Sequence, residues 1–287
     1  MPAIPVLSGL SEIARDYDAL ICDVWGVLHN GHRAYPAAAD ALQRFRAECG
    51  PVILLTNAPR PTVDVESMLG RVGVPLDCYD AVVSSGAVAR EDVICRIEAV
   101  GRPLRVFHLG PDRDGGVLGG LEIQRVDVPD AEVVLCTGLY DDTGETPDDY
   151  AELFRRMQAR SLVMLCANPD VVVQRGGTLI WCAGALAGAY ERIGGEVVYY
   201  GKPHPPIYEA TLAAARTIAG REILRPLAIG DGADTDIRGA NRMGIDAVFV
   251  AQGIHAAQLG ELTAEGLAQL FIVPEAHPKA AMRTLVW

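Results

Sequence analysis

Long hydrophobic runs are absent from this sequence, and none approaches the roughly 18–20 apolar residues that a membrane helix requires. Basic residues are scarce, since 25 Lys and Arg stand against 37 Asp and Glu and give a formal net charge of −12. Affinity for nucleic acid and for anionic membranes depends on clustered Lys and Arg. Residues 1–5 also lack the basic start and apolar core of a signal peptide. We therefore expect no nucleic-acid partner, no membrane association and no signal peptide.

Cysteine pairing signals are missing as well. The seven cysteines are odd in number and form no C-x-x-C pair and no zinc-site spacing with histidine. Cys136 and Cys166 lie inside apolar runs, where a free thiol behaves as a small hydrophobic side chain. This usage predicts a reducing, cytoplasmic location. No G-x-G-x-x-G or Walker loop and no G-x-S-x-G elbow occurs, so nothing supports a nucleotide-cofactor site or a serine hydrolase.

Short apolar runs alternate with longer amphipathic stretches along the 287 residues, a length that predicts roughly two domains at about 150 residues each. The runs are continuous and rich in Val, Ile and Leu, as in strands buried on both faces. They predict strands at 19–22, 52–55, 81–83, 104–107, 133–136, 162–166, 197–200, 227–229 and 247–250. Helices are predicted at 36–48, 62–72, 147–160 and 205–219. This alternation predicts an α/β fold with parallel sheets.

Polar residues follow four of the predicted strands. They are Asp23, the pair Thr56 and Asn57, Lys202, and the acidic, glycine-rich turn 230–236. Ligands of open α/β sheets bind beyond the carboxyl ends of the strands. Each motif alone also has a structural interpretation, as a turn, a solvated charge or a helix N-cap. Several carboxylates in one turn repel each other unless a cation binds, so the combination favours a metal-assisted site.

These motifs, in this order, resemble the four motifs of the haloacid dehalogenase (HAD) superfamily of phosphotransferases, and more narrowly its class IIA, the NagD-like and nitrophenylphosphatase-like branch. The resemblance spans nearly the whole chain. It rests on Asp23-x-x-Gly26-Val27-Leu28, Leu55-Thr56-Asn57, Gly201-Lys202-Pro203 and Gly230-Asp231-x-x-x-Thr235-Asp236-Ile237. Further class IIA landmarks are Ser84-Ser85-Gly86, Asn168-Pro169-Asp170 and Ala183-Gly184-Ala185-Leu186. The resemblance implies a Rossmann-like core of residues 1–86 and 183–287 and an inserted α/β cap domain of residues 87–182.

The resemblance also implies roles for the motif residues. Asp23 is the expected nucleophile, which attacks phosphorus and forms an aspartyl-phosphate. Thr56, Asn57 and Lys202 are expected to bind the phosphoryl group, and with Asp23 they complete the expected catalytic set. The expected metal is Mg²⁺, held by Asp23, the backbone carbonyl of Trp25, Asp231 and Asp236. Three carboxylates carry −3 while Mg²⁺ and Lys202 supply +3, so such a site can admit a phosphate dianion.

The sequence departs from the family at Trp25. Most HAD phosphatases have a second Asp at this position, which protonates the leaving group and then activates water. An indole cannot transfer a proton in the useful pH range, and such help is worth roughly 10²–10⁴-fold in rate. Three explanations stay open: the leaving group needs no acid, another residue such as His29, His32 or a cap carboxylate replaces it, or turnover is lost. Dehalogenases of the superfamily also lack the second Asp, but they need no Mg²⁺, whereas Asp231 and Asp236 are expected of a metal site.

The sequence therefore predicts a Mg²⁺-dependent phosphohydrolase of a small phosphorylated metabolite such as a sugar phosphate. The alternative is a protein of the same fold that binds or senses a phosphorylated ligand with little turnover, and Trp25 is the feature that favours it. The resemblance further implies a homodimer paired through the cap. The sequence names neither the physiological substrate nor the replacement for the missing acid.

Overall fold

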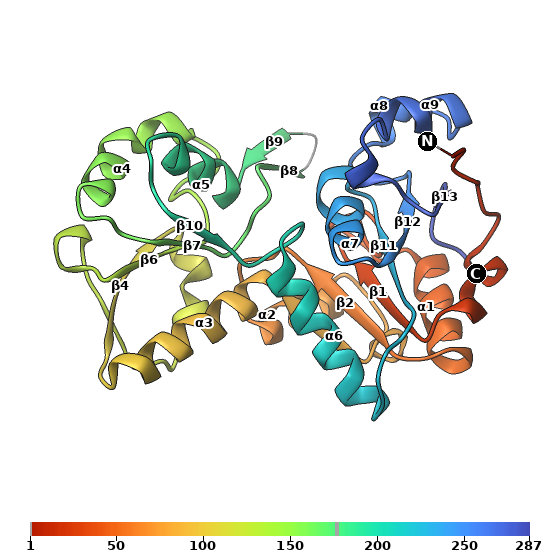
Figure 1. The fold of residues 1–287 in the computed structure, drawn as a ribbon, viewed down its shortest axis with the longest axis horizontal. Coiled ribbons are helices and arrows are strands. Elements are labelled where there is room, and N and C mark those ends of the chain that lie inside the picture. The colour runs from red at the N-terminus through yellow and green to blue at the C-terminus, as the bar shows by residue number, and fades with distance from the viewer. Residues whose placement is uncertain (1, 176–177) are drawn as a thin grey trace. The chain divides into compact units, whose positions relative to one another are not determined.

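The computed structural model describes residues 2–175 and 178–287 and divides into two compact units. The first unit comprises Met1–Thr56, Val65–Val83 and Lys202–Trp287, and the second comprises Asn57–Asp64 and Ser84–Gly201. Each unit is built on its own sheet (Figure 1). The division into a core of 1–86 and 183–287 and a cap of 87–182 stays a prediction.

The first unit contains a six-stranded sheet in the order β13-β12-β11-β1-β2-β3. Its strands are β1 (Ala19–Asp23), β2 (Val52–Thr56), β3 (Ala81–Ser84), β11 (Pro226–Gly230), β12 (Asp246–Val250) and β13 (Ala280–Met282). β1 pairs in parallel with both β11 and β2. The chain continues from β1 to β2 on one side and returns as β11 and β12 on the other, so the order of strands reverses at β1. Such a reversal is where open α/β sheets place their ligands.

Helices connect these strands (Figure 1). They are α1 (Pro36–Glu48), α2 (Thr62–Arg71), α6 (Pro205–Ala219), α7 (Arg238–Arg242), α8 (Ala256–Leu259) and α9 (Ala264–Leu270). α1 and α6 begin with proline, whose missing N–H would have no helical partner in the first turn. α6 is followed by Gly220, whose φ of 64° is one that glycine adopts without strain. The predicted helices 36–48 and 205–219 are confirmed to the residue.

The second unit is a three-layer α/β structure. Its five strands are parallel in the order β10-β7-β6-β4-β5. They are β4 (Leu104–Leu109), β5 (Ile123–Arg125), β6 (Val133–Cys136), β7 (Met164–Cys166) and β10 (Val197–Tyr199), and an antiparallel pair, β8 (Val172–Arg175) and β9 (Thr178–Trp181), follows β7. α4 (Ala151–Gln158) and α5 (Ala183–Arg192) pack on the face that contains Val134 and Cys136. α3 (Ser85–Val100) packs on the opposite face, which contains Val133 and Leu135.

The α/β fold with parallel sheets is confirmed, but some elements differ from prediction. The structure divides the predicted helix 147–160 into a 3₁₀ turn, Pro147–Tyr150, and the shorter α4. The predicted strand 162–166 begins two residues later, at Met164. The sequence did not predict β5, β8, β9, β13, α3, α5, α8 or α9. Within the part of the chain that the structure describes, no helix is both long enough and apolar enough to cross a membrane.

Candidate active site

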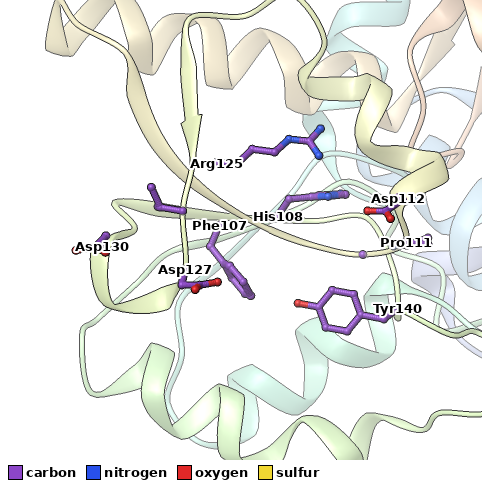
Figure 2. A pocket seen from close by; sticks show the side chains of 10 residues that line it. Phe107, His108, Pro111, Asp112, Arg125, Asp127, Asp130 and Tyr140 are labelled. Carbon is purple, nitrogen blue, oxygen red and sulfur yellow. The ribbon is translucent and has the colours of Figure 1, made fainter.

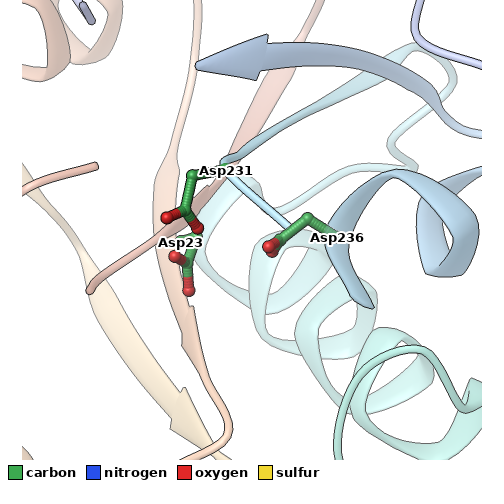
Figure 3. Close-up of side chains that lie close together, drawn as sticks. All are labelled: Asp23, Asp231 and Asp236. Atoms are coloured by element: carbon green, nitrogen blue, oxygen red, sulfur yellow. The ribbon is translucent and has the colours of Figure 1, made fainter. Parts of the chain in front are cut away.

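Three carboxylates meet at the carboxyl edge of the first sheet (Figure 3). Asp23 is the last residue of β1, and Asp231 directly follows the neighbouring strand β11, so the register of these strands places both at the same edge. Asp236 lies on the single π-helical turn Ala233–Ile237 that leads into α7. All three residues are buried, and each offers an oxygen within 4.8 Å of the others. The predicted metal ligands therefore converge.

Lys202 is the cation among these carboxylates. Its ammonium group contacts Oδ1 of Asp23 and donates a hydrogen bond of 2.7 Å to Oδ1 of Asp236. The residue is 3% exposed. A buried ion pair is stabilising only when its partners satisfy each other, and removal of one partner leaves an uncompensated charge. Lys202 therefore fixes the positions of Asp23 and Asp236 as well as neutralising one of them.

The charges of the cluster do not balance without a further cation. Burial raises the pKa of Asp23 well above its usual range; the Lys202 ammonium opposes this, while the charges of Asp236 and Asp231 add to it. Burial and the charge of Asp236 raise the pKa of Asp231 to about 7. With all three carboxylates ionised, the cluster and its one ammonium carry a formal charge of −2, which a single divalent cation would neutralise. The oxygen ligands and the uncompensated negative charge both fit Mg²⁺.

Two glycines leave room for the Asp231 carboxylate. A Cβ at Gly26 would lie 2.2 Å from Oδ2 of Asp231, and one at Gly253 would lie 1.7 Å from the same atom. Oδ2 accepts a hydrogen bond of 2.7 Å from the backbone N–H of Ile254. The loop after β12 and the turn after β1 therefore define where this carboxylate can lie.

Asp236 is held on both of its oxygens. Oδ2 accepts hydrogen bonds from the N–H of Gly232 at 3.0 Å and the hydroxyl of Thr235 at 3.3 Å, while Oδ1 accepts from Lys202. The Tyr208 hydroxyl donates to the backbone carbonyl of Asp236 at 3.1 Å. The turn and α6 together orient this carboxylate, so that it can hold Lys202 and a hydrated metal in fixed positions.

The Trp25 side chain is partly exposed and packs against His29 and Gly31. The residue is 44% exposed. Its ring meets His29 edge-on, with ring centroids 5.3 Å apart. A Cβ on Gly31 would lie 2.4 Å from the ring, so only glycine fits beside it. The indole offers an aromatic surface two residues after Asp23 and no titratable proton.

The structure argues against His29 as a substitute acid. The side chain is fully buried, and its Nδ1 accepts a hydrogen bond of 2.8 Å from the N–H of Gly31. Burial lowers its pKa to about 4, so the imidazole is neutral near physiological pH. His32 is exposed, and its backbone N–H donates to Asn30. His29 therefore acts as a support for the loop that carries Trp25.

The predicted phosphate-binding pair divides between the two units. Thr56 ends β2 in the first unit, beside β1, whose Asp23 is in register with Leu55. Asn57 belongs to the second unit, where its Nδ2 donates a hydrogen bond of 2.8 Å to Asp170. In the sequence, Asp170 stands out only as part of the Asn168-Pro169-Asp170 landmark, and nothing there indicates this contact. No local signal could have revealed it, because the two residues are 113 positions apart.

Two family models match this chain, one in its N-terminal part and one in its C-terminal part. Residues 20–114 match the family described as haloacid dehalogenase-like hydrolase, and residues 199–273 match a second family described as HAD-hydrolase-like. A solved structure of a haloacid dehalogenase-like hydrolase from Brucella suis 1330 is similar over its entire length. It is 43% identical, with a TM-score of 0.85, and the match covers 98% of this chain and 100% of that one.

Two curated relatives carry more specific names. The ribonucleotide monophosphatase NagD of Escherichia coli is 28% identical over 240 residues, which cover 82% of this chain and 88% of NagD. The D-glycerol 3-phosphate phosphatase of Mycobacterium tuberculosis is 26% identical over 258 residues, which cover 86% of this chain and 67% of that protein. A structure of glycerol phosphate phosphatase from the same organism in complex with magnesium shares the fold, with a TM-score of 0.68 and 21% identity over 94% of this chain and 76% of that one.

Proposed function

The chain belongs to the haloacid dehalogenase-like hydrolases, in their NagD-like class IIA branch, and from this membership we propose that it is a Mg²⁺-dependent phosphohydrolase of a small phosphorylated metabolite. The observation that carries the proposal is the buried cluster of Asp23, Asp231, Asp236 and Lys202, whose formal charge of −2 in the ionised form one divalent cation would neutralise. The names of the two curated relatives support phosphate monoesters as the substrate class.

Asp23 is the proposed nucleophile. One carboxylate oxygen attacks phosphorus as the bond between phosphorus and the leaving-group oxygen breaks, which gives an aspartyl-phosphate that water then hydrolyses. Lys202 already holds Asp23 in place and adds positive charge where the phosphoryl oxygens must lie. Thr56 and Asn57 are proposed to donate to the same phosphoryl oxygens.

The metal would be held by Asp23, Asp231 and the backbone carbonyl of Trp25, with Asp236 supporting it or its waters. When bound, Mg²⁺ would neutralise the phosphoryl oxygens as charge moves during transfer. Metal binding favours the ionised form of a coordinating carboxylate, so a cation in this site would favour ionised Asp231.

The leaving group receives no proton from position 25. A phenolate leaves as a stable anion, whereas an alkoxide needs a proton from elsewhere, so we expect aryl phosphates to be cleaved faster than alkyl phosphates. A metabolite such as a sugar phosphate remains the proposed natural class, with water or another group as the acid. Pairing of two chains through the second unit remains a prediction, which sedimentation or light scattering would test.

The first test is phosphate release with Mg²⁺ from p-nitrophenyl phosphate and from a panel of alkyl and sugar phosphates. Asp23→Asn should abolish release from every compound, whereas Asp40→Asn makes the same change at an exposed position of the same unit and should leave it intact. Full activity of Asp23→Asn would overturn the nucleophile assignment.

Trp25 favours a second candidate, a sensor that binds a phosphorylated ligand with little turnover. Such a protein would gain thermal stability from the ligand plus Mg²⁺ and leave the ligand intact. No phosphate release from any compound, together with ligand-dependent stabilisation that needs Mg²⁺, would favour the sensor over the enzyme.

A further inference from the structure

The second unit contains a cavity of about 630 Å³ that is lined entirely by residues between Phe107 and Tyr140 (Figure 2). The volume is within the range of about 300–1,000 Å³ that small-molecule sites occupy. None of the four residues of the buried metal-binding cluster lines it.

The topology of the second sheet places this cavity where ligands are expected. The chain passes from β4 to β5 on one side and then returns to form β6 on the other side of β4, so the strand order reverses between β4 and β6. The cavity is lined by residues at or just beyond the carboxyl ends of β4 and β5, and by Tyr140 after β6. An open parallel sheet binds ligands at this position.

Two aromatic rings and a carboxylate face the same space. In Figure 2 the Asp127 carboxylate lies beside the Phe107 ring, and the hydroxyl end of the Tyr140 ring points toward both of them. Tyr140 stacks on Tyr150 with centroids 5.8 Å apart, and its backbone N–H donates to the Tyr150 hydroxyl at 2.7 Å. The Tyr140 ring is therefore fixed before any ligand arrives. Aromatic faces and a carboxylate together attract organic cations.

The other charged groups leave this space negative. Asp112, Asp127 and Asp130 line the cavity against one cation, Arg125, and give a net charge of −2. The Arg125 guanidinium donates to the carbonyl of Gly115 at 2.8 Å and lies apart from Asp127 in Figure 2. His108 hydrogen-bonds Thr137 at 2.9 Å, and burial together with the charge of Arg125 lowers the pKa of this imidazole, which is neutral near physiological pH. An anionic ligand would meet repulsion here.

A metal ion does not fit the same carboxylates. Among the described residues, the group Asp23, Asp231 and Asp236 alone brings three His, Cys, Asp or Glu ligand atoms within 4.8 Å of one another. The carboxylates of this cavity are thus too dispersed to close around a small ion. Dispersed negative charge beside aromatic walls suits a larger cation.

We propose that this cavity binds a small organic cation, a primary or quaternary ammonium compound, whose charged group lies between the Asp127 carboxylate and the rings of Phe107 and Tyr140. The ligand is either free in solution or the ammonium-bearing part of a phosphate monoester. The binding proposal does not depend on phosphate hydrolysis, since no residue of the proposed catalytic set lines the cavity.

The test is calorimetric titration of the full chain with choline and with putrescine at fixed ionic strength. The uncharged carbon analogue of choline, 3,3-dimethylbutan-1-ol, is the matched control ligand. Asp127→Asn should weaken cation binding about tenfold, as loss of a charge-assisted contact does. Tyr140→Leu should weaken it about threefold through loss of the ring face. Asp148→Asn removes the same charge from an exposed position of the same unit outside the cavity and should change nothing.

Equal binding of choline and its carbon analogue, or equal effects of Asp127→Asn and Asp148→Asn, would overturn the proposal. So would binding of neither cation. Titration of Asp23→Asn with choline phosphate distinguishes the two sources of the cation. Binding of this ester tighter than that of choline identifies the cation as part of a substrate, and equal or weaker binding identifies a free ligand. Because these titrations need no turnover, they remain decisive if the proposed phosphatase activity fails.

Discussion

Position 25 decides which proton transfers the site can perform. A carboxylic acid there could protonate a leaving alkoxide, whereas the indole cannot. We predict that Trp25→Asp raises kcat/KM for alkyl phosphates about a hundredfold while changing that for p-nitrophenyl phosphate much less, because general acid catalysis typically contributes 10²–10⁴-fold where the leaving group needs it. Steady-state kinetics of the wild type and Trp25→Asp with both substrate classes measure the change in kcat/KM for each class.

Trp25→Phe is the control for this substitution, since it keeps an aromatic ring beside Gly31 and adds no proton donor. It should leave the preference for aryl phosphates unchanged. An unchanged preference in Trp25→Asp would contradict the prediction and show that another group already supplies the proton.

Lys202 combines a structural and a catalytic role, and the two can be separated. We predict that Lys202→Met abolishes turnover and, in EDTA, lowers the free energy of unfolding by about 3–5 kcal/mol, because it leaves the buried Asp23 and Asp236 without their cation. The double variant Lys202→Met/Asp236→Asn removes one of the repelling charges. It should recover part of the stability and none of the activity, as measured by urea unfolding and phosphate release. Equal stability of the single and double variants would contradict the charge argument.

At the level of elements, the loop after β12 restricts the position of Asp231. A Cβ at Gly253 would overlap the Asp231 carboxylate, whereas one at Gly70 on α2 would meet nothing within 4 Å. We predict that Gly253→Ala weakens Mg²⁺ binding about tenfold or more, since displaced ligands commonly cost this much affinity. Gly70→Ala should leave it unchanged. Mg²⁺-dependent turnover and calorimetry measure the affinity. Equal affinities of the two variants would show that the loop after β12 accommodates the added methyl group without displacing Asp231.

Asp18 connects the starts of β1 and β11 and makes stability depend on pH. Burial raises the pKa of its carboxyl, but the N–H groups of Leu224 and Arg225 and the guanidinium of Arg221 outweigh it and lower the pKa below its usual value. A carboxyl with a lowered folded-state pKa stabilises the fold above its unfolded pKa of about 3.9, and this stability is lost as the pH falls through the folded value.

We therefore predict that Asp18→Asn is less stable than the wild type near neutral pH and that the difference shrinks as the pH falls below about 4. Urea unfolding at several pH values measures it. Asp40→Asn, at an exposed position on α1, is the control and should show a smaller difference at neutral pH. A pH-independent difference for Asp18→Asn would mean that packing, rather than charge, explains the loss.

Burial on both faces is what made the central strands predictable. β6 was predicted to the residue because Val133–Cys136 is apolar throughout. β5 was missed because it is a short edge strand whose Gln124 and Arg125 are exposed. α3 was missed although Ser84 caps its N-terminus and Gly101 its C-terminus, because only a few of its side chains are buried and its apolar periodicity is weak.

The site was predictable to the extent that strand ends determine it. Asp23 and Asp231 converge because β1 and β11 are neighbouring parallel strands. The position of Lys202 between two carboxylates, and the contact of Asn57 with Asp170, depend on how distant segments pack. Sequence motifs predicted which residues carry the chemistry, but only the tertiary structure shows which of them orient one another.

At the scale of the whole molecule, the predicted metal site belongs to one of the two units. The chain carries a net charge of −12, so any divalent cation will screen the repulsion between its acidic residues and stabilise it slightly without a specific site. A specific site should add stability on top of screening, about 2.7 kcal/mol when Mg²⁺ is at a hundred times its Kd. We predict that Mg²⁺ raises the melting temperature more than NaCl of equal ionic strength, and that Asp231→Asn removes this excess.

Hydrogen exchange can locate the same effect within the molecule. Mg²⁺ should slow exchange of backbone amides in the first unit, most strongly in β1, β11 and the turn at Asp236, because opening of these elements would release the ion. Amides of the second unit should exchange at unchanged rates, since none of the three carboxylates belongs to it. Two results would contradict the proposed metal centre: equal protection of both units, or protection that persists in Asp231→Asn. Either would show that Mg²⁺ acts through the general negative charge of the chain.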